Sequence, residues 1–189
     1  MSEHHDAVLH EIQEMVQKSV FHAHRIADPL DCDVDSKYYG LGLIILKGFL
    51  EREMNKLAEV PPANKIPKRM QPVTQKPCIR EIDYWHYKFD PKSQWYGWEE
   101  LANCFRLADC FARGKGNLNG HGPRVKAFAR QLAKQEITDR KKKPVAPYFA
   151  VEGGDSLKLQ EDAVKRFAAL SGELINMAEK QLRKRKKRK

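Results

Sequence analysis

Residues 35–60 constrain the fold more than any other part of the chain. Apolar residues recur there every three or four positions, which predicts a helix with one broad apolar face. Asp35 and Ser36 are candidate N-cap residues for it. The apolar residues of this helix are Leu43, Leu46, Leu50, Met54 and Leu57, with Ile44 and Ile45 broadening the face. A face this wide requires burial on more than one side.

The same spacing predicts four further helices, over residues 7–26, 98–112, 123–137 and from Gln160 onward. In the first of them the apolar stripe consists of Val8, Ile12, Met15, Val16 and Val20. Residues 148–151 and 156–159 flank Gly153 and Gly154, a pattern typical of a β-hairpin. We therefore expect a mainly α fold: a bundle of about five helices with a small β-hairpin before the last helix.

Residues 60–97 interrupt this helical pattern inside one domain that we place at residues 1–182. Five prolines between residues 60 and 77 predict an extended connector. Seven aromatic residues follow between residues 84 and 98, interleaved with charged ones. They could stack nucleic-acid bases, or form a loop that folds back over the helical core. We favour the loop.

The composition excludes several classes of protein. The longest apolar candidate, residues 41–50, is interrupted by Lys47 and glycines, so we expect no membrane span. The first six residues are polar and acidic rather than signal-like, which favours a cytoplasmic protein. Four cysteines without a CxxC pair are expected to be packed thiols, and His22 and His24 would lie on opposite sides of a helix. We expect neither a metal nor a cofactor.

The net charge of +10 is concentrated at one end of the sequence. Seven consecutive cations form a basic tail at residues 183–189: Arg183, Lys184, Arg185, Lys186, Lys187, Arg188 and Lys189. Such a run attracts phosphate through counterion release, so a nucleic acid is the expected partner. The alternative is a solvated tail that only aids solubility.

A glycine-rich loop at residues 114–122 offers a second cationic site. Its backbone N–H groups could approach a phosphate, although the sequence lacks the ending of a P-loop. His121 lies between Lys115 and Arg124 in sequence and is the best candidate for acid–base chemistry on a phosphodiester. The alternative is a solvated loop histidine.

Three segments carry a resemblance to a known family. They are Leu46-Lys-Gly-Phe-Leu-Glu51, Arg106-Leu-Ala-Asp-Cys-Phe-Ala-Arg-Gly114 and Leu159-Gln-Glu-Asp-Ala-Val-Lys-Arg-Phe167. Their order over residues 38–181 resembles the HEPN superfamily of helical domains, whose members include metal-independent ribonucleases and inactive relatives. The resemblance implies RNA binding and a homodimer.

The catalytic residues of that family do not match. Its Arg falls on Ala108 and its His on Arg113, so no group at these positions can accept a proton at neutral pH. The resemblance therefore implies a catalytically degenerate RNA-binding protein, with Arg106, Arg113, Lys115 and Arg124 as phosphate contacts. Two alternatives stay open: an active ribonuclease that uses His121, and an antitoxin-like or other protein-interaction module.

Overall fold

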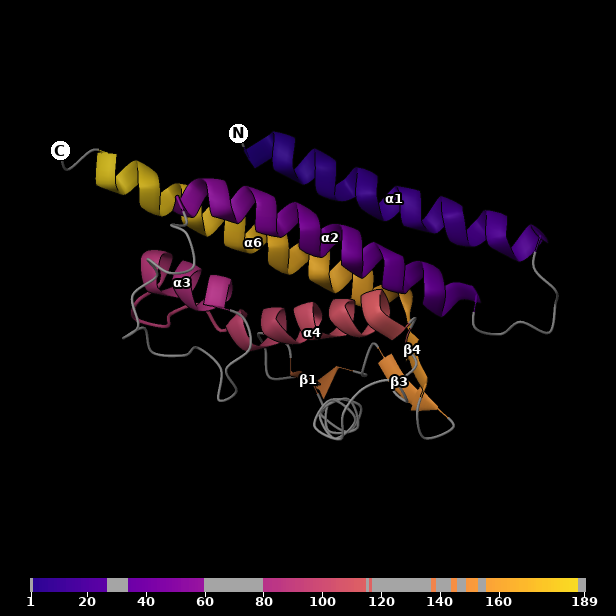
Figure 1. The fold of residues 1–189 in the computed structure, drawn as a ribbon. Helices are drawn as coiled ribbons and strands as arrows, with labels where there is room; N and C mark the ends of the chain where they lie inside the picture. Colours follow the sequence, from indigo (N-terminus) through magenta and orange to yellow (C-terminus); the bar gives the residue numbers. More distant parts are fainter. Residues whose placement is uncertain are drawn as a thin grey trace.

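The computed structural model describes residues 2–26, 34–59, 80–114, 116, 137–138, 144–145, 149–152 and 156–186 (Figure 1). Its helices are α1 (Ser2–Ile26), α2 (Val34–Ala58), α3 (Arg80–Phe89), α4 (Trp98–Gly114) and α6 (Glu161–Lys186). Its strands are β1 (Ile137–Thr138), β2 (Pro144–Val145), β3 (Phe149–Glu152) and β4 (Ser156–Leu159). The described part of the chain is mainly helical, as the sequence predicts.

Helix α2 packs against α1, α4 and α6. Figure 1 shows α1, α2 and α6 running side by side as three long rods, with α3 and α4 beneath them. Leu43, Leu46, Leu50 and Met54 have no exposed surface. The predicted burial of this helix on more than one side is confirmed, because three other helices cover it.

Two glycines in α2 allow its neighbours to approach closely. A Cβ atom at Gly40 would overlap the ring of Phe111 in α4, and one at Gly42 would lie 2.8 Å from Cγ2 of Val16 in α1. Because interiors are packed without spare volume, neither neighbour has room for a methyl group there. Gly48 differs, since no atom lies within 4 Å of the position that its Cβ would occupy.

The predicted apolar stripe of α1 agrees with the structure in most positions. In α1, Ile12, Val16 and Val20 are buried, and so is Leu9, which the sequence analysis left out. The prediction for Met15 is wrong, because this side chain is 45% exposed. Helix α1 contacts α2 and α6 on one side, and Met15 lies off that side.

Helix α3 corrects the prediction of a connector over residues 60–97. Its residues Ile82, Trp85 and Phe89 are buried in the core. The aromatic segment therefore covers the helical core, as we expected, but part of it is a helix and not a loop. Trp98 is buried as well, whereas Tyr87 and Tyr96 are exposed. Residues 60–79 lie outside the described part of the chain.

Asp90 fixes the turn between α3 and α4. One carboxylate oxygen accepts the backbone N–H of Gln94 at 2.9 Å. The other accepts the N–H of Trp95 at 2.8 Å and the indole N–H of Trp98 at 2.9 Å. Three N–H donors therefore satisfy both oxygens of this side chain, which is only 6% exposed.

The hairpin forms as predicted, with β3 and β4 antiparallel and Phe149 opposite Leu159. The predicted N-cap is wrong, because α2 begins at Val34 and Ser36 lies within its first turn. The hydroxyl of Ser36 donates to the carbonyl of Leu157 at 3.2 Å and accepts the N–H of Leu159 at 2.9 Å. This side chain therefore joins α2 to the hairpin.

Other predicted elements have a different outcome. Residues 123–136 of the fourth predicted helix lie outside the described residues, and Ile137 belongs to strand β1, which pairs with β2. Cys104 and Cys110 are buried thiols, and burial raises the pKa of Cys110 to about 11. Cys32 and Cys78 are not among the described residues. Within the described residues, no helix has the length and apolar character needed to span a membrane.

The glycines of α2 give a matched pair of stability predictions. Gly40→Ala should lower the free energy of unfolding by about 1–3 kcal/mol, because the added methyl group overlaps Phe111. Gly48→Ala should raise it by about 0.5–1 kcal/mol, because an exposed helical position gains helix propensity without a clash. Urea unfolding measures both, and equal effects of the two substitutions would contradict the packing described here.

Candidate polyanion-binding end of the bundle

The basic tail begins as a continuation of α6. The helix runs without a break across residues 182 and 183, where we placed the start of the tail, and ends at Lys186. Figure 1 shows these last turns projecting beyond the end of α2. Arg183, Lys184 and Arg185 are exposed, and Lys187, Arg188 and Lys189 lie outside the described residues. Arg183, Lys184 and Arg185 are thus presented on a regular helix.

Two cations at this end neutralise the carboxyl ends of neighbouring helices. The ammonium of Lys88 donates to the carbonyl of Ala58, the last residue of α2, and lies 3.4 Å from the carboxylate of Glu59. The guanidinium of Arg185 donates to the carbonyl of Lys88, near the end of α3, at 2.6 Å. The carboxyl end of a helix carries a partial negative charge, so both contacts are favourable. Arg185 therefore has a structural partner.

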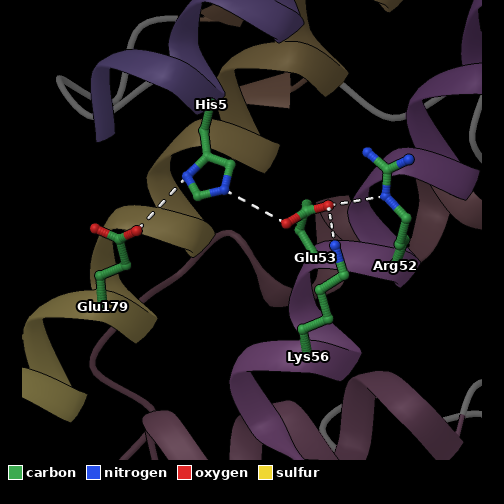
Figure 2. A network of polar contacts seen from close by, with 5 residues as sticks. All are labelled: His5, Arg52, Glu53, Lys56 and Glu179. Carbon is green, nitrogen blue, oxygen red and sulfur yellow. Dashed lines mark hydrogen bonds and ion pairs between the residues drawn. The ribbon is translucent and has the colours of Figure 1, made fainter. Parts of the chain in front are cut away.

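A buried histidine joins three helices close to the same end (Figure 2). Nε2 of His5 in α1 lies 3.5 Å from Oε2 of Glu53 in α2. Its Nδ1 lies 3.6 Å from Oε1 of Glu179 in α6. Within the described residues, neither His5 Nδ1 nor Glu179 Oε1 has a hydrogen-bond partner, although both atoms are buried. The ring of Phe49 packs edge-on against the imidazole, with centroids 6.4 Å apart.

Exposed cations surround this buried network. Nε of Arg52 lies 2.8 Å and Nζ of Lys56 3.2 Å from the same oxygen of Glu53 (Figure 2). Arg183 lies 3.4 Å from Oε2 of Glu179. The side chains of these three cations are between 63% and 69% exposed. The contacts Arg52–Glu53–His5–Glu179–Arg183 therefore place cations of α2 and α6 at one end of the bundle.

Opposing effects set the ionisation of Glu53. Burial acts to raise the pKa of this carboxyl, but the hydrogen bonds from Arg52 and Lys56 outweigh it, so the pKa of Glu53 is lowered. Glu51, two residues earlier, shows the opposite result, because burial raises its pKa more than Lys47 lowers it. Protonation of Glu53 therefore lowers the stability of the fold, whereas protonation of Glu51 raises it.

This arrangement can hold a multiply charged anion at the protein surface. Arg52, Lys56 and Arg183 are largely exposed, and each has several N–H donors, so phosphate groups can contact their remaining donors while the pairs with Glu53 and Glu179 persist. Lys184 has no polar partner among the described residues, so its ammonium group can contact a phosphate directly. No group of three His, Cys, Asp or Glu suited to a metal occurs in the described part of the chain.

The structure separates the other predicted phosphate contacts from this end. Arg106, half-buried on α4, donates to Oδ1 of Asn103 at 2.8 Å. Arg113 is exposed in the last turn of α4. Figure 1 shows that turn near the hairpin, at the end of the bundle opposite the tip of α6. Lys115, His121 and Arg124 lie outside the described residues, so their roles stay predictions.

Five residues of this network were not predicted from the sequence: His5 of α1, Arg52, Glu53 and Lys56 of α2, and Glu179 of α6. Glu179 and Arg183 are four residues apart, and Glu53 and Lys56 three apart, so helical charge pairing was a usable signal for them. No such signal exists for His5, which meets Glu53 and Glu179 only in the folded chain.

The two carboxyls of α2 predict a pH-dependent difference in stability. A lowered pKa gives stability that is present above the ordinary carboxyl value and is lost as the pH falls through the lowered one. Glu53→Gln should therefore lower the free energy of unfolding at about pH 7 by about 1 kcal/mol or less, and by still less at about pH 3, where Glu53 itself is protonated.

Glu51→Gln is the matched control. Its raised pKa makes the ionised form unfavourable in the folded state, so this substitution should slightly raise stability at about pH 7. Urea unfolding at both pH values measures the two variants. A cost of Glu53→Gln that does not change with pH, or an equal cost for Glu51→Gln, would show that Arg52 and Lys56 do not stabilise the ionised Glu53.

Comparison of the chain with protein-family models, with curated proteins and with solved structures finds no match. The resemblance to the HEPN superfamily therefore stays a hypothesis that rests on the three segments quoted above.

Proposed function

We propose that this chain binds nucleic acid, with RNA as the expected ligand, through the end of the bundle formed by the last turns of α6 and the cations of α2. The observation that carries the proposal is the projecting cationic helix, on which Arg183 and Lys184 are exposed. Arg52 and Lys56 extend the positive surface onto α2, through the network around His5.

The physical basis is the release of counterions from the phosphate backbone. Each phosphate that a Lys or Arg neutralises releases condensed cations into solution, so affinity falls as the salt concentration rises. The guanidinium groups of Arg52 and Arg183 can also contact phosphate oxygens in a bidentate manner. None of these contacts reads a base, so we expect binding without strong sequence preference.

The choice of RNA, and the absence of cleavage, come from the resemblance to the HEPN superfamily. Ala108, which stands at the family's Arg, is 1% exposed and has no cationic group. Arg113, which stands at the family's His, is exposed but cannot act as a base at neutral pH. Both observations support a degenerate binding protein. Cleavage of RNA that depends on His121 would instead establish the ribonuclease alternative.

Removing two cations from the end of α6 should weaken binding in a salt-dependent way. For a single-stranded ligand each phosphate contact contributes about 0.7 to the slope of log K against log salt concentration. The double variant Arg183→Gln, Lys184→Gln should therefore reduce this slope by about 1.4. Fluorescence anisotropy of a labelled single-stranded RNA, titrated at several KCl concentrations with a chelator present, measures it.

Lys165→Gln is the control for this experiment. Lys165 lies on the same helix and is half exposed, but it pairs with Glu161 in the first turns of α6, far from the tip. Its substitution should leave the slope unchanged. Absence of binding even at low salt would overturn the proposal and favour a protein-interaction module, as would an equal effect of the control and the double variant.

A further inference from the structure

A serine and a histidine lie within hydrogen-bond distance in the turn that joins α3 to α4. Oγ of Ser93 is 2.8 Å from Nε2 of His86. Ser93 is exposed to solvent, whereas His86 is only 8% exposed. Ser93 therefore lies at the surface, while the ring that contacts its hydroxyl is shielded by the protein.

The surroundings of His86 suit a general base. Trp98 packs edge-on against the imidazole, with ring centroids 5.2 Å apart and planes at 88°. Burial lowers the pKa of His86, more than the nearby carboxylates of Asp90 and Asp83 raise it. The ring is therefore neutral at pH 7, and in the tautomer with its proton on Nδ1, Nε2 accepts the hydrogen of the Ser93 hydroxyl. The two carboxylates would stabilise the imidazolium that forms when Nε2 takes that proton.

The backbone of Ser93 is unusual for a residue with a side chain. Its φ is +51°, in the left-handed region where glycine is the default residue. The turn closes through a hydrogen bond from the N–H of Ser93 to the carbonyl of Asp90 at 2.9 Å. Glycine would relieve the strain but would remove the hydroxyl. Strained residues of this kind are concentrated at functional sites, where the surrounding structure holds them in place.

We propose that Ser93 and His86 form a nucleophile and base pair that reacts with small activated carboxylic esters. Oγ of Ser93 attacks the carbonyl carbon as its proton moves to Nε2 of His86. The bond to the leaving alcohol then breaks, and the alkoxide takes the proton from His86. Water repeats the sequence: its proton goes to His86, its oxygen bonds to the acyl carbon, and the bond to Ser93 breaks as Oγ regains a proton. Ester and water are thus converted into acid and alcohol.

This inference does not depend on nucleic-acid binding, because neither Ser93 nor His86 is among the proposed phosphate contacts. Its rival is a purely structural role, in which the hydroxyl only holds the turn between α3 and α4. A structural hydroxyl has no reason to be more reactive than any other serine. Reactivity therefore separates the two interpretations, whereas stability alone does not.

The experiment treats the folded protein with a fluorophosphonate probe and locates the adduct by mass spectrometry. In this reaction Oγ of the serine forms a bond to phosphorus, fluoride leaves, and the hydroxyl proton passes to His86. We expect modification of Ser93 and not of Ser19, whose hydroxyl donates to the carbonyl of Met15 instead of to an imidazole. His86→Ala should slow the modification about 100-fold, and added imidazole should restore part of the rate.

Ser93→Gly keeps the test independent of folding. Glycine adopts a positive φ without strain, so this variant should fold as the parent protein does, and its modification and ester hydrolysis at this site should both be lost. The proposal is overturned if folded protein gives no Ser93 adduct, or if Ser93 and Ser19 react equally fast. A modification rate that His86→Ala leaves unchanged would also overturn it.

Discussion

The burial of α2 is the constraint on which the rest of the structure depends. Its apolar residues point in several directions, so no single neighbour can cover them, and α1, α4 and α6 pack around it. The close approach of α1 and α4 is possible because Gly42 and Gly40 stand where a Cβ would collide with Val16 and Phe111. Ser36 then attaches the hairpin to the first turn of the same helix. The positions of both ends of the bundle follow from this packing.

Apolar spacing predicted the parts of the fold that depend on local pattern. The buried residues Leu43, Leu46, Leu50 and Met54 follow directly from it, whereas the hairpin was predicted from the glycines between its two strands. The prediction that Met15 is buried was wrong, because periodicity locates an apolar stripe on a helix but does not show how much of that stripe the neighbouring helices cover. Helix α3 was missed because charged and aromatic residues alternate through it. Ile82, Trp85 and Phe89 nevertheless have helical spacing and form its buried face.

The candidate site was predicted only where it is contiguous in sequence. The cations of the tail are visible in the sequence as a run, and their continuation as helix follows from α6. The contribution of α2 depends on contacts between remote residues, because His5 meets Glu53 and Glu179 only after the three helices have packed. The contact between Ser93 and His86 could not be predicted from the sequence either. It depends on a turn in which Ser93 has a positive φ, a conformation that a residue other than glycine rarely adopts.

The length of α6 sets the minimum length of a ligand that contacts both ends of the bundle. The helix has 26 residues, which corresponds to about 39 Å. The last turn of α4, which includes Arg113, lies near the hairpin that leads into α6, and Arg183 lies in the last turns of α6 (Figure 1). One turn of a DNA duplex is about 34–36 Å long. A short oligonucleotide can therefore occupy one end only, whereas a duplex that contacts both ends must be longer than one turn.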